Sequence, residues 1–273
     1  MRPGVRRDSD IPRQNGPIGA TVDPMPPADV VPHGAARPAE APGPLLTSGT
    51  SADVYALDED RVLRRYREGR DAGPEVVLLR HVGTHRYPAP QVLDAAGSDI
   101  VMTRLHGPTL LQALGAGEIS ISDAAQVLAD LHGRLHDVPA PASWDVPADH
   151  DWPSAGGGPV VVHLDLHPGN VILTESGPGV VDWANARTGT AELDVAVTAV
   201  LVAEVAVDAG GDYSQAARAL LAAFLHASPV SPVAALDDAA ALRAIAPLLL
   251  PGERELVPAA AALVRTMVEL TAS

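Results

Sequence analysis

Hydrophobic positions between residues 45 and 105 fall in short runs that are separated by turns. Their alternation predicts a hairpin and two further strands, and Pro74 at the start of an apolar stretch predicts a helix that ends near Gly83. The four strands predicted in this way cover residues 52–56, 61–65, 91–94 and 100–103. With a further strand before the turn at Ser48, we expect a five-stranded antiparallel sheet with one helix.

After Gly107-Pro108 the hydrophobic spacing becomes mainly helical. Apolar residues between Val127 and Val138 recur at helical intervals and predict a helix capped by Ser122 or Asp123. Short β-type runs follow at residues 159–162, 171–173 and 179–181. The Ala-, Val- and Leu-rich chain from Ala191 onward predicts three to four packed helices.

Residues 1–44 differ from the rest of the chain in composition. They contain ten prolines and five glycines, with five arginines balanced by five acidic residues. Such a segment buries too little apolar surface to offset its ordering entropy, so we expect a disordered tail. The predicted organisation is thus a tail at 1–44, a sheet-rich part at 45–105 and a helical part at 106–273.

The composition narrows the possible chemistry. The 273 residues include no cysteine, which excludes disulfides, thiolate metal sites and a thiol nucleophile. All 19 basic residues are arginine, so a P-loop lysine or a Schiff-base lysine is excluded as well.

The charge argues against a nucleic-acid partner. The net charge is −15 and only eight residues are aromatic, whereas nucleic-acid binding needs a basic face and stacking platforms. The longest apolar run, residues 195–207, is too short for a membrane span of about 20 residues. We therefore expect a cytoplasmic protein with neither nucleic-acid nor membrane partners.

One segment carries the candidate chemistry. His163-Leu164-Asp165-Leu166-His167-Pro168-Gly169-Asn170 follows a predicted strand, and a later strand ends at Asp182. An Asp followed by Asn five residues later, and by a second Asp twelve beyond that, is the spacing with which phosphotransferases assemble a base and two magnesium ligands. Mg²⁺ prefers oxygen ligands, and the Asn170 amide and Asp182 carboxylate supply them.

This segment resembles the catalytic loop of the aminoglycoside phosphotransferase and choline kinase family. The kinase pattern H-R-D-L-x-x-x-N aligns without a gap onto His163–Asn170. The resemblance implies a two-lobed, protein-kinase-like α+β fold with an antiparallel sheet in the N-lobe and a mainly helical C-lobe. It implies an ATP-dependent phosphotransferase in which Asp165 is the catalytic base, Asn170 and Asp182 bind Mg²⁺, and His163 supports the loop.

The resemblance also implies a nucleotide site within residues 45–105. The turn Ser48-Gly49-Thr50-Ser51 offers backbone N–H groups to phosphate oxygens. The third strand carries Arg64 where the family pattern has lysine, and Glu75 on the following helix is its expected partner. The expected hinge is Met102–Leu105, in which the backbones of Thr103 and Leu105 would contact adenine.

Four further residues, His167, Asp194, His132 and His136, have candidate roles. His167 either approaches the γ-phosphate or hydrogen-bonds within the loop. Asp194 resembles the family acid that braces the catalytic loop. His132 and His136, four residues apart, form either half of a zinc site or ordinary surface or packing histidines.

Two alternative functions use the same residues. A zinc-dependent hydrolase would bind its metal through His163, Asp165 and His167, with Asp182 as a fourth ligand or base. A nucleotide-binding pseudokinase would explain the replacement of lysine by Arg64. The retained base and metal ligands favour an active enzyme.

The acceptor is predicted from charge. Residues 106–273 contain 6 arginines and 20 acidic residues, a net charge of −14, whereas residues 46–105 have a net charge of −1. An acidic site concentrates cations, so we expect a small cationic molecule with a hydroxyl group, such as an aminoglycoside or an amino alcohol. The sequence does not indicate an oligomeric state.

Overall fold

The computed structural model describes residues 42–49, 51–142, 144, 157–208, 211–246 and 251–272, with the backbone alone at residues 251, 271 and 272. All of them belong to one unit, residues 39–273. The expected disordered tail falls almost wholly on residues 1–41, which lie outside the described part. Thr50 of the predicted phosphate turn lies outside it too.

The first part of the described chain is an antiparallel sheet of five strands. Its strands lie in the order β1-β2-β3-β5-β4. Their bounds are β1 Leu45–Ser48, β2 Ala52–Ala56, β3 Arg61–Tyr66, β4 Val92–Ala96 and β5 Asp99–Thr103. The prediction of a five-stranded antiparallel sheet is confirmed.

Helix α1 crosses between the third and fourth strands. It covers Gly73–Thr84 after a short 3-10 turn, η1 (Arg67–Gly69), and has Pro74 in its first turn as predicted. Leu78, Leu79 and Val82 are buried along one side of the helix. Glu75 is buried as well, so α1 carries a carboxylate into the interior beside the sheet.

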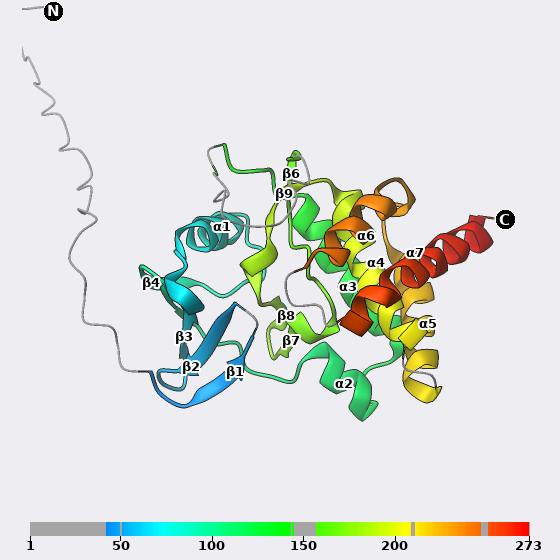
Figure 1. Cartoon of the computed structure of the whole chain (residues 1–273). Coiled ribbons are helices and arrows are strands. Elements are labelled where there is room, and N and C mark those ends of the chain that lie inside the picture. The colour runs from blue at the N-terminus through cyan, green and yellow to red at the C-terminus, as the bar shows by residue number, and fades with distance from the viewer. Residues whose placement is uncertain are drawn as a thin grey trace, which may run out of the picture. The chain divides into compact units, whose positions relative to one another are not determined.

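The rest of the described chain is mainly helical (Figure 1). Helix α4 lies in the middle of this part and packs against α3, α5, α6 and α7. The helices are α2 Leu110–Ala116, α3 Ile121–His136, α4 Ala191–Asp208, α5 Gly211–Ala227, α6 Leu236–Ala244 and α7 Pro251–Ala272, with a 3-10 turn η4 at Val233–Ala235. Four described α-helices follow residue 190, in agreement with the prediction, and the α+β fold class is confirmed.

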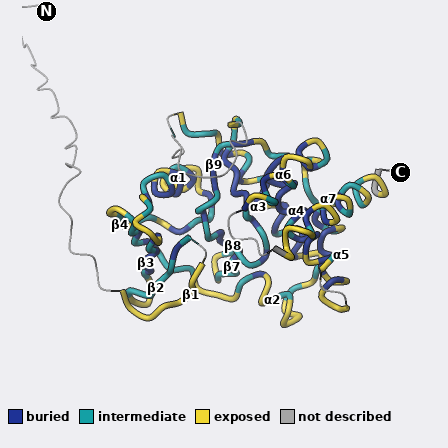
Figure 2. Tube along the Cα trace, in the orientation of Figure 1, coloured by how far each residue is buried: buried dark blue, intermediate teal, exposed yellow. Residues whose placement is uncertain are grey.

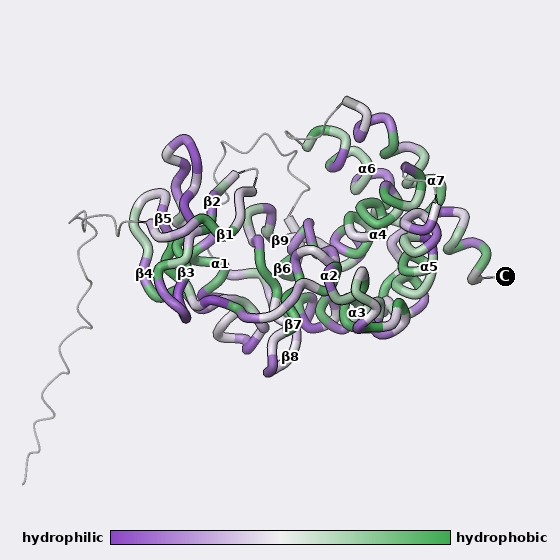
Figure 3. Tube along the Cα trace, turned by 90° about the horizontal axis from the view of Figure 1, so that it is seen from below, coloured by the Kyte–Doolittle hydropathy of each residue, from purple (hydrophilic) through white to green (hydrophobic). Residues whose placement is uncertain are grey.

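Burial follows this arrangement. Twelve residues of α4 are buried, among them Val195, Val200 and Ala203. Figures 2 and 3 show this helix as mostly buried and strongly hydrophobic, whereas β1 and α2 are largely exposed. A helix that is apolar on nearly every side is typical of the centre of a core.

The cap predicted for α3 is wrong by a few residues. The N-cap is Ser120, whose hydroxyl oxygen accepts a hydrogen bond from the backbone N–H of Asp123. Ser122 and Asp123 lie inside the first turn instead. Ser120, Ser122 and Asp123 lie within four residues and give similar cap signals, and only the backbone geometry distinguishes them.

Two small antiparallel ribbons separate α3 from α4 and carry the candidate motif. One pairs β6 (Val160–Val162) with β9 (Arg187–Gly189), and the other pairs β7 (Val171–Thr174) with β8 (Gly177–Val180). The 3-10 turns η2 (Pro168–Asn170) and η3 (Trp183–Asn185) precede β7 and β9. The connections between these strands therefore bring residues 163–170 and 181–186 together.

No helix among the described residues is both long enough and apolar enough to cross a membrane.

Candidate active site

Asp165 lies on the loop that follows β6, and this loop has an unusual backbone. Leu164 has a φ of 57°, a left-handed conformation that non-glycine residues rarely adopt and that clusters at functional sites. The intrinsic preference of Leu164 does not favour this conformation, so contacts with other parts of the protein must hold the loop in it.

Asp194 on α4 supplies those contacts. Its Oδ1 accepts hydrogen bonds from the backbone N–H groups of His163 (3.1 Å) and Leu164 (2.8 Å), and its Oδ2 lies 2.9 Å from Nε2 of His136. Asp194 is fully buried. Burial alone would raise its pKa, but the hydrogen bond with His136, the neighbouring histidines and the backbone donors outweigh it and lower the pKa. The predicted bracing role of Asp194 is confirmed.

His163 supports the same loop from its other side. Its ring Nε2 lies 3.1 Å from the carbonyl oxygen of Val181, the residue before Asp182. Burial lowers the pKa of His163 to about 4, so the ring is neutral at neutral pH and donates this hydrogen bond. His163 thus supports the loop, as the family resemblance implies, and it does so by connecting the Asp165 loop with the Asp182 segment.

Asn170 lies between the two aspartates. Its Nδ2 donates to the backbone oxygen of Asp165 at 2.9 Å and to Oδ2 of Asp165 at 3.2 Å. Its own backbone carbonyl accepts a hydrogen bond from Val181 N at 2.9 Å. Because the amide nitrogen faces Asp165, the amide oxygen is the atom of this side chain that remains available to a cation.

Asp182 follows β8 in a left-handed conformation, with φ 63° and ψ 67°. Its Oδ1 accepts a hydrogen bond from Nη2 of Arg64 at 2.8 Å, and its side chain is 40% exposed. Burial would raise its pKa, but the positive charge of Arg64 and this hydrogen bond lower it, so Asp182 is ionised at neutral pH.

Arg64 joins the sheet to the Asp182 segment. It lies on β3 and is only 7% exposed. Its Nε lies 3.3 Å from Oε2 of Glu75 on α1, so the predicted pair of Arg64 and Glu75 forms. The hydroxyl of Tyr66 also donates to Oε2 of Glu75. One arginine therefore connects the carboxylates of Glu75 and Asp182.

The surroundings of Asp165 raise its pKa. Burial and the negative charge of Asp182 raise its pKa to about 7, although Arg243 and the hydrogen bond from Asn170 act in the opposite direction. A carboxylate with a pKa near neutrality suits general base chemistry.

His167 is held within the loop. Its Nδ1 accepts a hydrogen bond from the backbone N–H of Gly169 at 3.1 Å, and its Nε2 lies 3.8 Å from Oδ1 of Asp165. A Cβ atom at Gly169 would lie 2.7 Å from the ring, so only glycine allows this contact. Burial lowers the pKa of His167, which favours its neutral form and the local hydrogen bond.

Several polar groups of the predicted phosphate turn already form hydrogen bonds within the protein. Gly49 N donates to the carbonyl of Ala52 at 2.9 Å, and Arg67 N donates to the carbonyl of Ser51 at 2.9 Å. The hydroxyl of Ser48 donates to Oδ1 of Asp53 at 2.7 Å. The turn lies between β1 and β2 as predicted, and these hydrogen bonds fix its position at the sheet edge.

The predicted hinge follows β5. The N–H of Thr103 donates to the carbonyl of Gln91 at 3.0 Å, and its Oγ1 accepts from Gln91 N at 2.9 Å. A Cβ atom at Gly179 would lie 2.7 Å from Leu105 Cδ1, so the Leu105 side chain packs against β8. A contact between adenine and the Thr103 N–H would have to replace its bond to Gln91.

The zinc alternative does not match this geometry. The left-handed Leu164 breaks the alternation that would point His163, Asp165 and His167 to one side. His163 is directed to the carbonyl of Val181 instead. Within the described ranges, no three His, Asp or Glu side chains form a group that could hold a metal ion.

His132 and His136 are packing residues. The ring of His132 is fully buried, with Nδ1 2.8 Å from the carbonyl of Leu128 and Nε2 3.1 Å from Oγ1 of Thr198. His136 contacts Asp194. The packing alternative is therefore correct and the zinc half-site is not, and neither ring is a surface residue.

The oxygen atoms near Asp165 suit Mg²⁺. The amide oxygen of Asn170 and the carboxylate of Asp182 are hard donors on neighbouring segments, and Mg²⁺ is commonly held by one or two such side chains together with substrate phosphates. Asp182 already attracts one positive group, the guanidinium of Arg64. The residues present therefore fit the ion that the sequence predicts.

Some charged residues near the site were not predicted from the sequence. Arg243 on α6 forms an ion pair with Glu204 on α4, with Nε–Oε1 at 2.9 Å, and its charge acts on both Asp165 and His167. Their separation of 39 residues gives no local signal. Only the packing of α4 against α6 brings this pair toward the catalytic loop.

The antiparallel sheet, the helical part and the Arg64–Glu75 pair agree with the kinase-type phosphotransferase fold that the sequence predicts. The profile of the phosphotransferase enzyme family, APH, matches residues 43–152 and 144–228. The chain belongs to this family, and it is a small-molecule phosphotransferase that acts on a hydroxyl group. No curated protein sequence matches it significantly.

Solved structures show the same fold at low sequence identity. The ADP-bound aminoglycoside phosphotransferase APH(2'')-Ib is 18% identical, over 81% of this chain and 91% of that chain, with a TM-score of 0.50. The gentamicin complex of APH(2'')-IIa is 17% identical, over 81% and 89%, with a TM-score of 0.50. An ethanolamine kinase from Plasmodium vivax is 10% identical, over 81% and 83%, with a TM-score of 0.50.

Proposed function

We propose that the protein transfers the γ-phosphate of ATP to a hydroxyl group of a small cationic molecule with the help of Mg²⁺. The observation that carries this proposal is the contact chain from Asp165 through Asn170 to Val181 and Asp182. Asn170 bonds to Asp165 with its amide nitrogen and to Val181 with its carbonyl. The contacts link the three residues that we propose as base and metal ligands, and phosphoryl transfer requires such groups close together.

Asp165 is the proposed catalytic base. Its oxygen Oδ1 is not bound by Asn170, which contacts Oδ2, so Oδ1 is available to the acceptor hydroxyl. With a pKa of about 7, Asp165 is partly ionised at neutral pH and can take the hydroxyl proton as the oxygen attacks phosphorus. Most of the remaining rate would come from alignment of the reactants.

The proposed Mg²⁺ ligands are Asn170 and Asp182. When bound, the ion would neutralise the negative charge that develops on the transferred phosphate. The low pKa of Asp182 supports this assignment, because an ionised carboxylate is the stronger ligand.

The nucleotide is proposed to bind the sheet-rich part, residues 45–105. Arg64 contacts both Glu75 and Asp182, the proposed metal ligand, and these contacts support a role for its guanidinium in binding the phosphates. The turn at residues 48–51 and the hinge at Thr103 and Leu105 are the proposed contacts to phosphate and adenine. The ADP bound to the structurally similar APH(2'')-Ib supports a nucleotide as the phosphate donor.

The acceptor is proposed to bind the helical part, residues 106–273, whose net charge is −14. Gentamicin, which is bound in the structure of APH(2'')-IIa, and ethanolamine, after which the Plasmodium vivax kinase is named, are hydroxylated amines, which supports a cationic acceptor. Arg243 also belongs to this part, and its positive charge acts on Asp165.

A screen of ATP consumption tests the proposal. The purified protein is supplied with Mg²⁺ and with amino alcohols, aminoglycosides, macrolides or sugars, and ADP formation is measured. We expect turnover with at least one hydroxylated amine and loss of turnover when Mg²⁺ is chelated. Binding of ATP without turnover of any acceptor would favour the pseudokinase alternative instead.

Asp182→Ala isolates the metal-dependent step. Its matched control is Asp208→Ala, which removes an exposed carboxylate at the end of α4. We expect Asp182→Ala to abolish the effect of Mg²⁺ on ATP affinity, whereas Asp208→Ala keeps it. An unchanged Mg²⁺ effect in a folded Asp182→Ala protein would contradict the assignment.

A further inference from the structure

Arg67, the residue that follows β3, contacts the predicted phosphate turn with both its side chain and its backbone. Its Nη2 donates to Oδ1 of Asp53 at 2.6 Å and to the hydroxyl oxygen of Ser48 at 2.5 Å. Its backbone N–H donates to the carbonyl of Ser51 at 2.9 Å. One residue therefore contacts both ends of the turn that joins β1 to β2.

The strand register explains why these side chains meet. Ser48 pairs with Asp53 across β1 and β2, and Asp53 pairs with Arg65 across β2 and β3. Residues paired across an antiparallel sheet point to the same face, and so do residues two positions apart along one strand. Arg67 comes two positions after Arg65 and reaches the same face as Asp53.

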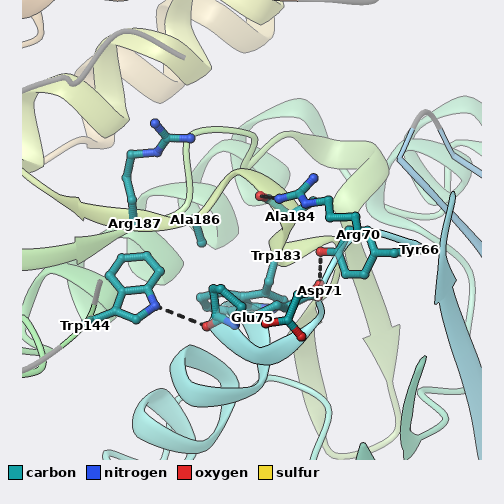
Figure 4. A pocket seen from close by; sticks show the side chains of 10 residues that line it. Tyr66, Arg70, Asp71, Glu75, Trp144, Trp183, Ala184, Ala186 and Arg187 are labelled. Atoms are coloured by element: carbon teal, nitrogen blue, oxygen red, sulfur yellow. Dashed lines mark hydrogen bonds between the residues drawn. The ribbon is translucent and has the colours of Figure 1, made fainter. Parts of the chain in front are cut away.

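The opposite face of β3 carries Arg64 of the proposed nucleotide site. Arg64 and Tyr66 point to this face, where both contact Glu75. Tyr66 and Glu75 line the small pocket of Figure 4, which shows the hydrogen bond between them. The end of β3 therefore connects two parts of the proposed nucleotide site: Arg64 on one face and, through Arg67, the turn on the other.

Arg65 forms a similar ion pair on the same face as Arg67, but directs it to β5. Its Nη2 lies 2.6 Å from Oδ2 of Asp99, its cross-strand partner. The side chains of Arg65 and Arg67 are 32% and 44% exposed. The two ion pairs are thus alike in distance and exposure and differ in the segment that they hold.

The contacts of Arg67 matter for the position of the turn more than for folding stability, because ion pairs this exposed contribute little to stability. Hydrogen bonds from Arg67 and Ser48 lower the pKa of Asp53, so its carboxylate is ionised at neutral pH and attracts Arg67. A turn of small residues loses conformational entropy when it orders around phosphates. Contacts that order the turn beforehand reduce this cost of binding.

We propose that Arg67 is a positioning residue for the nucleotide, which acts through Asp53 and Ser48 to hold the turn at residues 48–51 in its phosphate-binding conformation. This inference rests on the proposed function, because it requires that the turn binds phosphates. In this role Arg67 contacts no phosphate itself, since its guanidinium is engaged by Ser48 and Asp53.

Nucleotide binding to variants of the full chain tests this role. Isothermal titration calorimetry measures the Kd for ATP and for adenosine, each with Mg²⁺, in the parent, Arg67→Gln and Asp53→Asn proteins. We expect both variants to raise the Kd for ATP by about three- to tenfold, because the turn must then become ordered during binding. The Kd for adenosine should not change, since adenosine has no phosphates for the turn to contact.

Asp53→Asn separates positioning from a direct effect of charge. Loss of a negative charge near the phosphates would by itself strengthen ATP binding, whereas loss of the contact that holds Arg67 should weaken it. Arg65→Gln is the matched control, because it removes the same charge from the same face of the sheet. We expect its Kd for ATP to stay near the parent value.

Three results in a parent protein that binds ATP would overturn the proposal. Arg67→Gln or Asp53→Asn could bind ATP at least as tightly as the parent, Arg65→Gln could lose as much ATP affinity as Arg67→Gln, or adenosine affinity could fall together with ATP affinity. The Tm is recorded for each protein, and we expect all variants to fold because these side chains are partly exposed.

Failure of this inference is distinguishable from failure of the proposed function. A parent protein that binds neither ATP nor adenosine would contradict both. ATP binding that is insensitive to Arg67→Gln and Asp53→Asn would contradict the positioning role alone.

Discussion

Two polar clusters hold the proposed active site, and they differ in burial. The brace cluster consists of His136, His163 and Asp194 beneath the Asp165 loop. Asp194 is completely buried, and its two oxygen atoms are shared among two backbone N–H groups and a histidine. A charge satisfied in this way has no alternative partner, so the brace cluster is expected to be rigid.

The arginine cluster consists of Arg64, Tyr66, Glu75 and Asp182. It is buried at Arg64 and Glu75 but ends at Asp182, whose side chain is 40% exposed. At that exposed end Asp182 is accessible to solvent, whereas Glu75 contacts Arg64 in the interior. The comparison indicates that the loop of the proposed base has a buried support, whereas the proposed metal ligand Asp182 is held by a partly exposed ion pair.

Removal of the central brace carboxylate should have the largest effect. Asp194→Ala leaves two buried N–H groups and a histidine without their acceptor, so we expect the free energy of unfolding to fall by about 3–5 kcal/mol. Urea denaturation measures it. Asp208→Ala, on the same helix and exposed, is the control. A loss no larger than that of the control would show that the brace cluster does not stabilise the loop.

Two substitutions of Arg64 separate the contribution of its charge from that of its planar guanidinium group. Arg64→Ala leaves Glu75 buried without its cation and should lower the free energy of unfolding by about 3 kcal/mol. Arg64→Lys keeps the charge, so we expect a loss of only about 1 kcal/mol, because lysine lacks the planar fork that contacts both carboxylates. Urea denaturation and ATP binding are measured for both. Equal losses would mean that the charge of Arg64 does not matter.

The buried histidines make stability depend on pH. The pKa of His163 is lowered to about 4 by burial, whereas the unfolded chain takes up this proton near pH 6.5. The unfolded state therefore binds more protons between these values, and stability decreases as the pH falls from about 6.5 toward 4. We expect a loss on the order of 2 kcal/mol between pH 7 and pH 5.

Urea denaturation at the two pH values checks this dependence. His163→Gln should flatten it, whereas substitution of the exposed His106 by Gln should not. An equally steep dependence in the His163→Gln protein would remove His163 as its source.

Tyr66→Phe should have the smallest effect. It removes one hydrogen bond to Glu75 but leaves the ion pair of Glu75 with Arg64, so we expect a loss of about 1 kcal/mol in the free energy of unfolding. Tyr55→Phe on the neighbouring strand β2 is the matched control. A loss as large as that of Arg64→Ala would make Tyr66, rather than Arg64, the main partner of Glu75.

Elements with strong local sequence signals could be predicted from the sequence alone. The strands at residues 52–56 and 61–66, the proline at the start of α1 and the loop motif around Asp165 were predicted at nearly their observed positions. Alternation, proline and the fixed spacing of the motif each act over a few residues. The pairing of Arg64 with Glu75 was predicted from the family resemblance, and the structure forms it.

Contacts between distant segments could not be predicted in the same way. The pairing of Arg243 with Glu204 depends on how the helices pack, and the bond from His163 to Val181 depends on how the two ribbons lie together. The cap of α3 was missed for a different reason, because Ser120, Ser122 and Asp123 are all suitable caps. Local preference leaves such choices open until tertiary contacts select one.

The central claim is that Asp165 acts on the acceptor while Asn170 and Asp182 serve the nucleotide. The most direct test compares Asp165→Ala with the parent protein, measuring phosphoryl transfer and the Kd for ATP in the presence of Mg²⁺. We predict that kcat falls by at least about 100-fold, as expected for loss of a general base, while the Kd for ATP changes little. Equal kcat values in the two proteins would contradict the account.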